Sequence, residues 1–313
     1  MNTGLKITAF AAAVAATFGT AYGVGKGVDP VTSEKKPASE HGEHGVEKGE
    51  GAREGEPAGH AEAVPGGLQI SERGYTLDLE TSRIDAEKRE ELRFAVVKDG
   101  TGKNVTAYER EHGKELHLIV ASRDLTTYRH LHPVRAADGT WSTPVELPEA
   151  GGYRVFADFK PGGAEEGLTL GADLAVAGKY GPKALPETNT KASVDGYEVS
   201  LKGELKPGKS AEVTLNVEKN GRPVTDLQPY LGSYGHLVAL RSGDLAYLHV
   251  HPTGEPGDGR TKPGPGVSFA ATAPSEGAYR LFLDFKHEGV VRTAAFTVRV
   301  GSAGGGGESG HAH

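Results

Sequence analysis

Three histidines recur in this chain with the same spacing, and they are the residues best suited to carry chemistry. The first two histidines of each copy are thirteen positions apart, and the third follows after one residue and precedes a proline. The two sets are His117, His130 and His132, and His236, His249 and His251. Neutral imidazole is the commonest protein ligand for metals and titrates near neutral pH. The repeat therefore predicts a metal or proton site rather than six unrelated surface histidines.

The sulfur ligands that many metal sites use are missing. The chain contains no cysteine, and its one methionine is Met1. Disulfides, thiolate sites, blue-copper centres and a thioether site for Cu(I) are therefore excluded. Imidazole, carboxylate and backbone oxygen remain as ligands. They suit Cu(II) or Zn(II), and the Irving–Williams order favours copper, so we expect Cu(II) or Zn(II) as the cofactor.

Two aspartates at matched positions are further candidate ligands. Asp158 and Asp284 each follow an arginine, Arg154 and Arg280, by four positions. An internal carboxylate would complete an imidazole site. Alternatively, these aspartates are structural acids paired with the arginines, and the histidines hydrogen-bond across a hairpin. The sequence leaves both alternatives open.

The elements that must hold these residues are short β-strands. Runs of alternating apolar and polar residues begin after residue 67, and similar runs recur in the second half of the chain. Glycine is frequent, with 46 residues, which favours turn-rich β modules over helical bundles. Tyr153 and Tyr279 each begin a run just after a glycine turn, the local pattern of the tyrosine corner in immunoglobulin-like sandwiches. We therefore predict an all-β fold of two tandem Ig-like β-sandwich modules.

Composition divides the chain into segments. Lys6 precedes the uncharged run 7–25, which is typical of an export signal and is also just long enough to cross a bilayer as an anchor helix. Bulky apolar residues are scarce in residues 28–66, which predicts disorder there. The predicted segments are 1–27 (signal peptide or membrane anchor), 28–66 (disordered spacer), 67–178 (first Ig-like module), 191–300 (second Ig-like module) and 301–313 (disordered Gly/His tail). The spacer and tail contain His41, His44, His60, His311 and His313, which we interpret as parts of solvated tethers.

A hairpin explains how the histidines of the second module could converge. If residues 243–244 form a two-residue turn, His236 lies opposite His251 and diagonal to His249. Side chains alternate along a strand, so all three imidazoles then share one face and can reach one metal ion.

The first module fits this register less well. Its turn would contain Leu125, and leucine is a poor turn residue. A wider loop over 123–126 would shift the pairing by one and turn His117 to the opposite face. The sequence therefore predicts a firmer site in the second module.

Four segments carry a resemblance to known proteins, namely 117–125, 128–133, 228–236 and 247–252. In these segments the chain resembles a family of actinobacterial exported proteins with paired Ig-like modules, related to the YtkA-like and CopC-like β-sandwich proteins of the bacterial envelope. The resemblance implies a sandwich fold, an envelope location and, through the CopC-like proteins, copper handling outside the cytoplasm.

Charge and motifs limit the remaining functions. A net charge of −7 without a basic stripe gives no reason to expect nucleic acid as a partner. No nucleophile elbow, phosphate loop or paired-carboxylate motif appears, so we expect no enzyme. We expect an extracytoplasmic protein, membrane-anchored or secreted, that buffers or chaperones Cu(II) or Zn(II) through the repeated histidines. The membrane would be contacted through the N-terminal segment if it is uncleaved. The alternative is an extracellular Ig-like interaction or structural module at the cell envelope that binds no metal.

Overall fold

The computed structural model describes residues 64–248 and 250–301, and these residues form strands and loops. Within these two ranges no helix is long and apolar enough to cross a membrane. The predicted leader, spacer and tail, apart from residues 64–66 and 301, lie outside the described residues, and so does His249.

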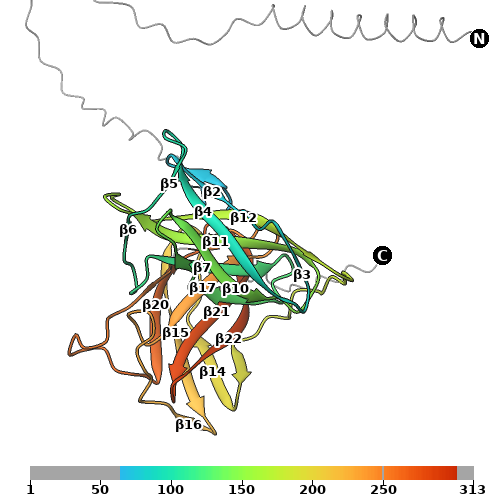
Figure 1. Ribbon diagram of the computed structural model, residues 1–313. Helices are drawn as coiled ribbons and strands as arrows, with labels where there is room; N and C mark the ends of the chain where they lie inside the picture. Colours follow the sequence, from blue (N-terminus) through green and yellow to red (C-terminus); the bar gives the residue numbers. More distant parts are fainter. Residues whose placement is uncertain (1–63, 249, 302–313) are drawn as a thin grey trace, which may run out of the picture. The chain divides into compact units, whose positions relative to one another are not determined.

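The first module, β1 to β12, consists of two sheets with an apolar core between them (Figure 1). One sheet has the order β1 (Ser71–Glu72), β2 (Tyr75–Asp78), β4 (Arg89–Lys98), β10 (Thr140–Glu146) and β9 (Val134–Arg135), with β5 (Lys103–Asn104) paired to β4. The other has the order β3 (Arg83–Asp85), β12 (Leu168–Ala177), β11 (Gly151–Pro161), β7 (Leu116–Ser122) and β8 (Tyr128–Leu131), with β6 (Tyr108–Glu109) paired to β11. Phe94 from the first sheet and Leu118 from the second meet in the core.

The second module, β13 to β22, repeats this arrangement. One sheet has the order β13 (Lys191–Val194), β14 (Tyr197–Lys202), β15 (Ser210–Lys219), β20 (Gly266–Thr272) and β19 (Val250–Pro252), with β16 (Arg222–Pro223) paired to β15. The other has the order β18 (Tyr247–Leu248), β17 (His236–Arg241), β21 (Gly277–His287) and β22 (Val290–Val300). Leu215 and Leu281 from the two sheets meet in its core. The all-β fold of two tandem sandwiches is therefore confirmed.

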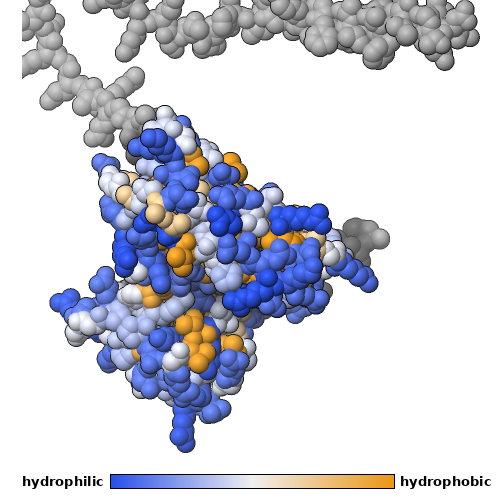
Figure 2. All heavy atoms as spheres, in the orientation of Figure 1, coloured by the Kyte–Doolittle hydropathy of each residue, from blue (hydrophilic) through white to orange (hydrophobic). Residues whose placement is uncertain are grey.

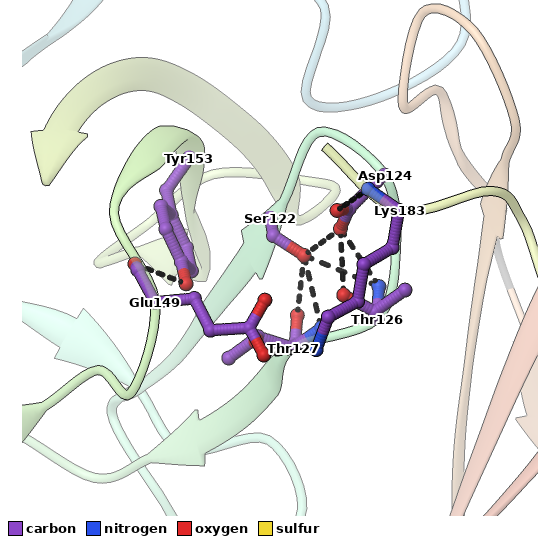
Figure 3. A network of polar contacts seen from close by, with 7 residues as sticks. All are labelled: Ser122, Asp124, Thr126, Thr127, Glu149, Tyr153 and Lys183. Carbon is purple, nitrogen blue, oxygen red and sulfur yellow. Dashed lines mark hydrogen bonds and ion pairs between the residues drawn. The ribbon is translucent and has the colours of Figure 1, made fainter. Parts of the chain in front are cut away.

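Both modules contain the predicted tyrosine corner. The hydroxyl of Tyr153 donates a hydrogen bond to the backbone oxygen of Glu149 at 2.9 Å (Figure 3). The hydroxyl of Tyr279 donates to the backbone oxygen of Ser275 at 2.8 Å. Each bond satisfies a polar group at the end of a side chain that is otherwise buried in the core. These bonds fix the start of β11 and β21, the strands that carry the two candidate aspartates.

The hairpins that carry the histidines end in matched loops, 123–126 and 242–245. The loops are closed by backbone hydrogen bonds from Ser122 to Thr127 and from Arg241 to Ala246, each 3.0 Å long. Each loop thus has four residues, which is one more on each side than the two-residue turn expected from the sequence. A symmetric widening leaves the pairing unchanged, so the predicted shift of the first hairpin is wrong.

The poor turn residue in these loops has a packing role. Leu125 and Leu245 adopt positive φ, 57° and 63°, and both side chains are fully buried. In the first loop the carboxylate of Asp124 accepts hydrogen bonds from the hydroxyls of Ser122 and Thr126, which holds the turn closed (Figure 3). Burial of the leucine thus offsets the cost of its left-handed backbone.

A third apolar cluster joins the two modules, and we call it the interface cluster. Its buried members are Ile119, Ala121, Leu125, Tyr128 and Phe156 of the first module, and Val238, Leu240, Leu245 and Phe282 of the second. Tyr128 stacks on Phe282 with ring centroids 4.1 Å apart, and Phe156 contacts Tyr247 at 5.7 Å. These residues are repeat equivalents, so each module uses the same face, as in an isologous interface. The molecular surface in Figure 2 is by contrast mostly hydrophilic, with apolar residues in small separate patches.

Candidate metal centre

Strand alternation carries one histidine of each module to the edge of the interface cluster. Along β7, His117 shares a face with Ile119, and along β17, His236 shares a face with Val238. The two imidazole rings are stacked, with their centroids 5.4 Å apart. The first histidine of each set therefore lies at one place between the modules.

Three imidazoles gather there, and we call them the histidine cluster: His117, His130 and His236. One ring nitrogen from each lies within 4.8 Å of one from each of the others. His130 reaches the cluster from β8, where it pairs with Ile119 and so projects from the same face as His117. Two of the three imidazoles thus come from the first module and one from the second.

Hydrogen bonds orient two of these rings. The Nε2 atom of His117 lies 3.2 Å from the backbone oxygen of Glu111, and the Nδ1 atom of His130 lies 2.8 Å from Oδ2 of Asp284. A carbonyl oxygen only accepts, and so does an ionised carboxylate, so each of these ring nitrogens must be the donor. The opposite nitrogen of each neutral ring then carries a lone pair. Donation from a ligating histidine to a carbonyl or carboxylate is the usual support of metal-bound imidazole.

The two lone pairs face each other. Nδ1 of His117 lies 3.1 Å from Nε2 of His130, and both atoms are acceptors in the tautomers just assigned. Such a contact needs a cation between the nitrogens, either a proton on one ring or a shared metal ion. Two nitrogens that each lie about 2.0 Å from a Zn(II) or Cu(II) ion are about 2.8 to 3.3 Å apart. The observed separation fits that geometry.

Two further ring nitrogens strengthen the fit. Nε2 of His236 and Nε2 of His132 are buried and have no hydrogen-bond partner among the described residues. Burying a polar atom without a partner is costly, and most such atoms in proteins find one. The ring of His132 lies 4.9 Å from that of His130 and 5.5 Å from that of His117. His132 is therefore next to the histidine cluster and is the nearest candidate for a fourth ligand.

Burial keeps His117, His132 and His236 neutral. It lowers the pKa of His117 to about 3, with the neighbouring His130 as the next cause. It also lowers the pKa of His132 to about 4 and that of His236 well below its usual value. Only the neutral ring can bind a metal ion. His117 and His236 are consequently in their ligating form at neutral pH.

Asp284 supports the site from the second module, whereas Asp158 is not brought into the group of three histidines. Oδ1 of Asp284 accepts a hydrogen bond from Thr293 at 2.6 Å, which leaves Oδ2 for His130. Asp158 pairs with His117 across β11 and β7, and its Oδ1 accepts from Thr169 at 2.9 Å. Arg154 donates to the backbone oxygen of Gly67 and to the carboxylate of Asp173.

The predicted meeting of His236 with His251 is wrong. Pairing between β17 and β18 follows the expected register, with Ala239 opposite Leu248. The chain then crosses to the other sheet, where His251 on β19 pairs with Ala270 and is exposed. A strand that changes sheets takes its later residues to a different surface, so the register could not be extended to His251.

Two neighbours of the histidine cluster have no counterpart in the histidine repeat. The ring of His112 lies 5.9 Å from that of His236, and the ring of Tyr230 lies 6.5 Å from that of His130. His112 and Leu231 both adopt positive φ, 52° and 54°, in matched loops of the two modules. The shared position of these loops was detectable from the repeat, but their proximity to the histidines depends on how the modules dock.

Comparisons with solved structures return β proteins of low similarity. The Yersinia pseudotuberculosis adhesin InvE is 9% identical, and the match covers 74% of this chain and 60% of the adhesin with a TM-score of 0.23. A putative membrane-anchored protein from Corynebacterium diphtheriae is 10% identical, with 74% and 59% covered and a TM-score of 0.21. The chain thus spans less than two thirds of the length of either protein.

Sequence comparison identifies the repeated unit. No curated protein matches the chain. The family model described as "Domain of unknown function (DUF8832)" matches residues 70–174 and again residues 192–302. The two matches together cover more than half of the chain, one in each sandwich. The chain therefore belongs to this family and contains its domain twice.

Proposed function

We propose that this protein binds one Cu(II) or Zn(II) ion between its two modules, with His117, His130 and His236 as ligands, and that it buffers or chaperones the metal outside the cytoplasm. The observation that carries the proposal is the contact of 3.1 Å between two ring nitrogens whose partner nitrogens are both hydrogen-bond donors. A metal ion satisfies both lone pairs at once, and the unpartnered nitrogen of His236 supplies the third bond.

The choice of metal follows from the ligands. Imidazole suits Cu(II) and Zn(II), and the chain offers no thiolate that would favour a softer ion. The resemblance to CopC-like proteins favours copper, and the export signal expected at residues 7–25 favours a location outside the cytoplasm. The ion would be held by imidazole nitrogens, while Asp284 would orient the ring of His130.

The proposal assigns no enzymatic role. The side chains of His130 and Asp284 are only 3% and 2% exposed, and His117 as a whole is 3% exposed. A hydrolytic metal site needs an open coordination position that substrate can reach. This degree of burial suits metal retention.

Metal titration of single-histidine variants tests the proposal. Replacing His236 by alanine removes one of three ligands, and we expect the affinity for Zn(II) or Cu(II) to fall at least tenfold in isothermal titration calorimetry, which is about 1.4 kcal/mol. His251→Ala is the matched control, since it removes an exposed histidine of the same repeat. Equal affinity of wild type and His236→Ala would contradict the proposal.

A second candidate function is an extracellular interaction module that binds no metal. It is favoured by the long loop 253–265 between β19 and β20, which projects from the second module (Figure 1). The carboxylate of Asp258 holds this loop by accepting hydrogen bonds from the backbone nitrogens of Arg260 and Thr261. Pre-ordered loops on a rigid sandwich commonly bind partners. In this case His236→Ala would lower the melting temperature, and the wild type would bind no metal.

A further inference from the structure

We infer that the metal ion controls whether the two modules stay docked against each other, so that metal loading and module separation are one coupled equilibrium. The inference rests on the proposed metal site. The observation that carries it is the division of the site between modules: His117 and His130 come from β7 and β8, whereas His236 and the supporting Asp284 come from β17 and β21.

Neither module has the complete site. The first module offers two ligands, but the carboxylate that orients His130 belongs to the second. Among the described residues, the second module contributes His236 to the group of three imidazoles. Separating the modules would leave two ligands on one side and one on the other. A metal ion with three imidazole ligands would therefore bind the docked arrangement far better than the separated one, and a ligand shifts an equilibrium by its difference in affinity for the two states.

The ion cannot reach its ligands easily while the modules are docked. The ring of His130 and the carboxylate of Asp284 are almost completely buried, and Nε2 of His236 is buried as well. On one side, the site borders the interface cluster, in which Tyr128 stacks on Phe282. The direct route to the ligands is separation of the same two faces that carry them. Loading and release should therefore involve opening of the interface.

Without a cation, the docked interface also contains polar atoms that lack a hydrogen-bond partner. The lone pairs of His117 and His130 would face each other at 3.1 Å, and the hydroxyl of Tyr128 is buried without a partner among the described residues. Both features oppose docking, whereas the reciprocal aromatic contacts favour it. Because these contributions oppose each other, one bound ion can shift the equilibrium between docked and separated modules.

Spin labels measure this coupling directly. The chain has no cysteine, so Lys98→Cys and Lys209→Cys place one label on each module at exposed positions. With Zn(II), which is diamagnetic, double electron–electron resonance on the full chain should give one narrow distance. With EDTA the distribution should broaden and extend to longer distances. The same labelled chain carrying His236→Ala should give the broad distribution under both conditions, while His251→Ala should behave like the wild type.

The outcomes separate this inference from the proposed function. An identical narrow distribution with Zn(II) and with EDTA, in a chain that calorimetry shows to bind Zn(II), overturns the coupling and leaves the metal site standing. Absence of Zn(II) binding in calorimetry overturns both. A narrowing by Zn(II) that persists in His236→Ala also overturns the inference, since the histidines outside the cluster would then be responsible.

Discussion

Asp284 offers a sharp test of the site because it is not itself one of the three gathered ligands. Its Oδ2 lies 2.8 Å from Nδ1 of His130, and both side chains are at most 3% exposed. Asp284→Asn keeps the size of the side chain and an oxygen acceptor but removes the negative charge that faces Nδ1 of His130. Loss of such a supporting carboxylate typically lowers metal affinity 10- to 100-fold. We therefore expect a loss of about 1.4 to 2.7 kcal/mol in binding free energy.

The measurement is competition titration of Zn(II) against a chromophoric chelator. The matched control is Asp226→Asn, because Asp226 also accepts a hydrogen bond from a histidine of the second module, Nε2 of His287 at 3.0 Å, but away from the histidine cluster. Asp226→Asn should leave the affinity unchanged. If Asp284→Asn binds Zn(II) as tightly as the wild type, the assignment of His130 as a ligand supported by Asp284 is wrong.

Three further predictions concern stability in the presence of a chelator. The folded pKa of His117, about 3, lies below the unfolded value of about 6.5, so the unfolded chain binds more protons. The contribution of this residue to the free energy of unfolding should therefore be constant above about pH 6.5 and lower by about 2 kcal/mol at pH 5. Urea unfolding that is independent of pH would contradict this. Tyr128→Phe removes a buried hydroxyl without a partner among the described residues but keeps the stacked ring, so it should raise the free energy of unfolding by about 1 kcal/mol in the same assay. A decrease would show that the hydroxyl has a hydrogen-bond partner. Arg154→Met breaks hydrogen bonds to backbone oxygens and an ion pair with Asp173, and should cost about 3 kcal/mol. The repeat equivalent Arg280→Met loses one hydrogen bond, to Thr297, but also removes a buried Nε atom without a partner among the described residues, so it should cost no more than about 1 kcal/mol. Equal losses in thermal unfolding would contradict the difference in contacts.

The fold could be predicted because its signals are local. A tyrosine after a glycine turn is sufficient to indicate the corner that Tyr153 and Tyr279 form, and short alternating runs indicate the strands. The pairing of β17 with β18 also followed from the loop position, since Ala239 lies opposite Leu248 as expected. What the local pattern did not indicate is where a strand leaves its sheet. That step separates His251 from His236.

The position of the site could not be predicted by treating each module separately. Each hairpin lies within one module, whereas the histidine cluster forms where the outer faces of β7 and β17 meet. One signal was present in the sequence: β7 has apolar residues on both faces, and all seven of its residues are buried. A strand with two apolar faces indicates that its outer face also packs against protein. The partner of that face depends on the docking of the modules, for which no local pattern exists.

The most direct test of the shared site is the number of ions bound per chain. The five histidines outside the modules, His41, His44, His60, His311 and His313, are first replaced by serine in the full chain. The protein is then dialysed against excess Zn(II), washed by gel filtration and analysed for metal by mass spectrometry. One shared site predicts about one zinc ion per chain, and none when His117 and His236 are both replaced by alanine. Two ions per chain would indicate a separate site in each module, and a metal-free protein would show that the histidines serve only to join the modules.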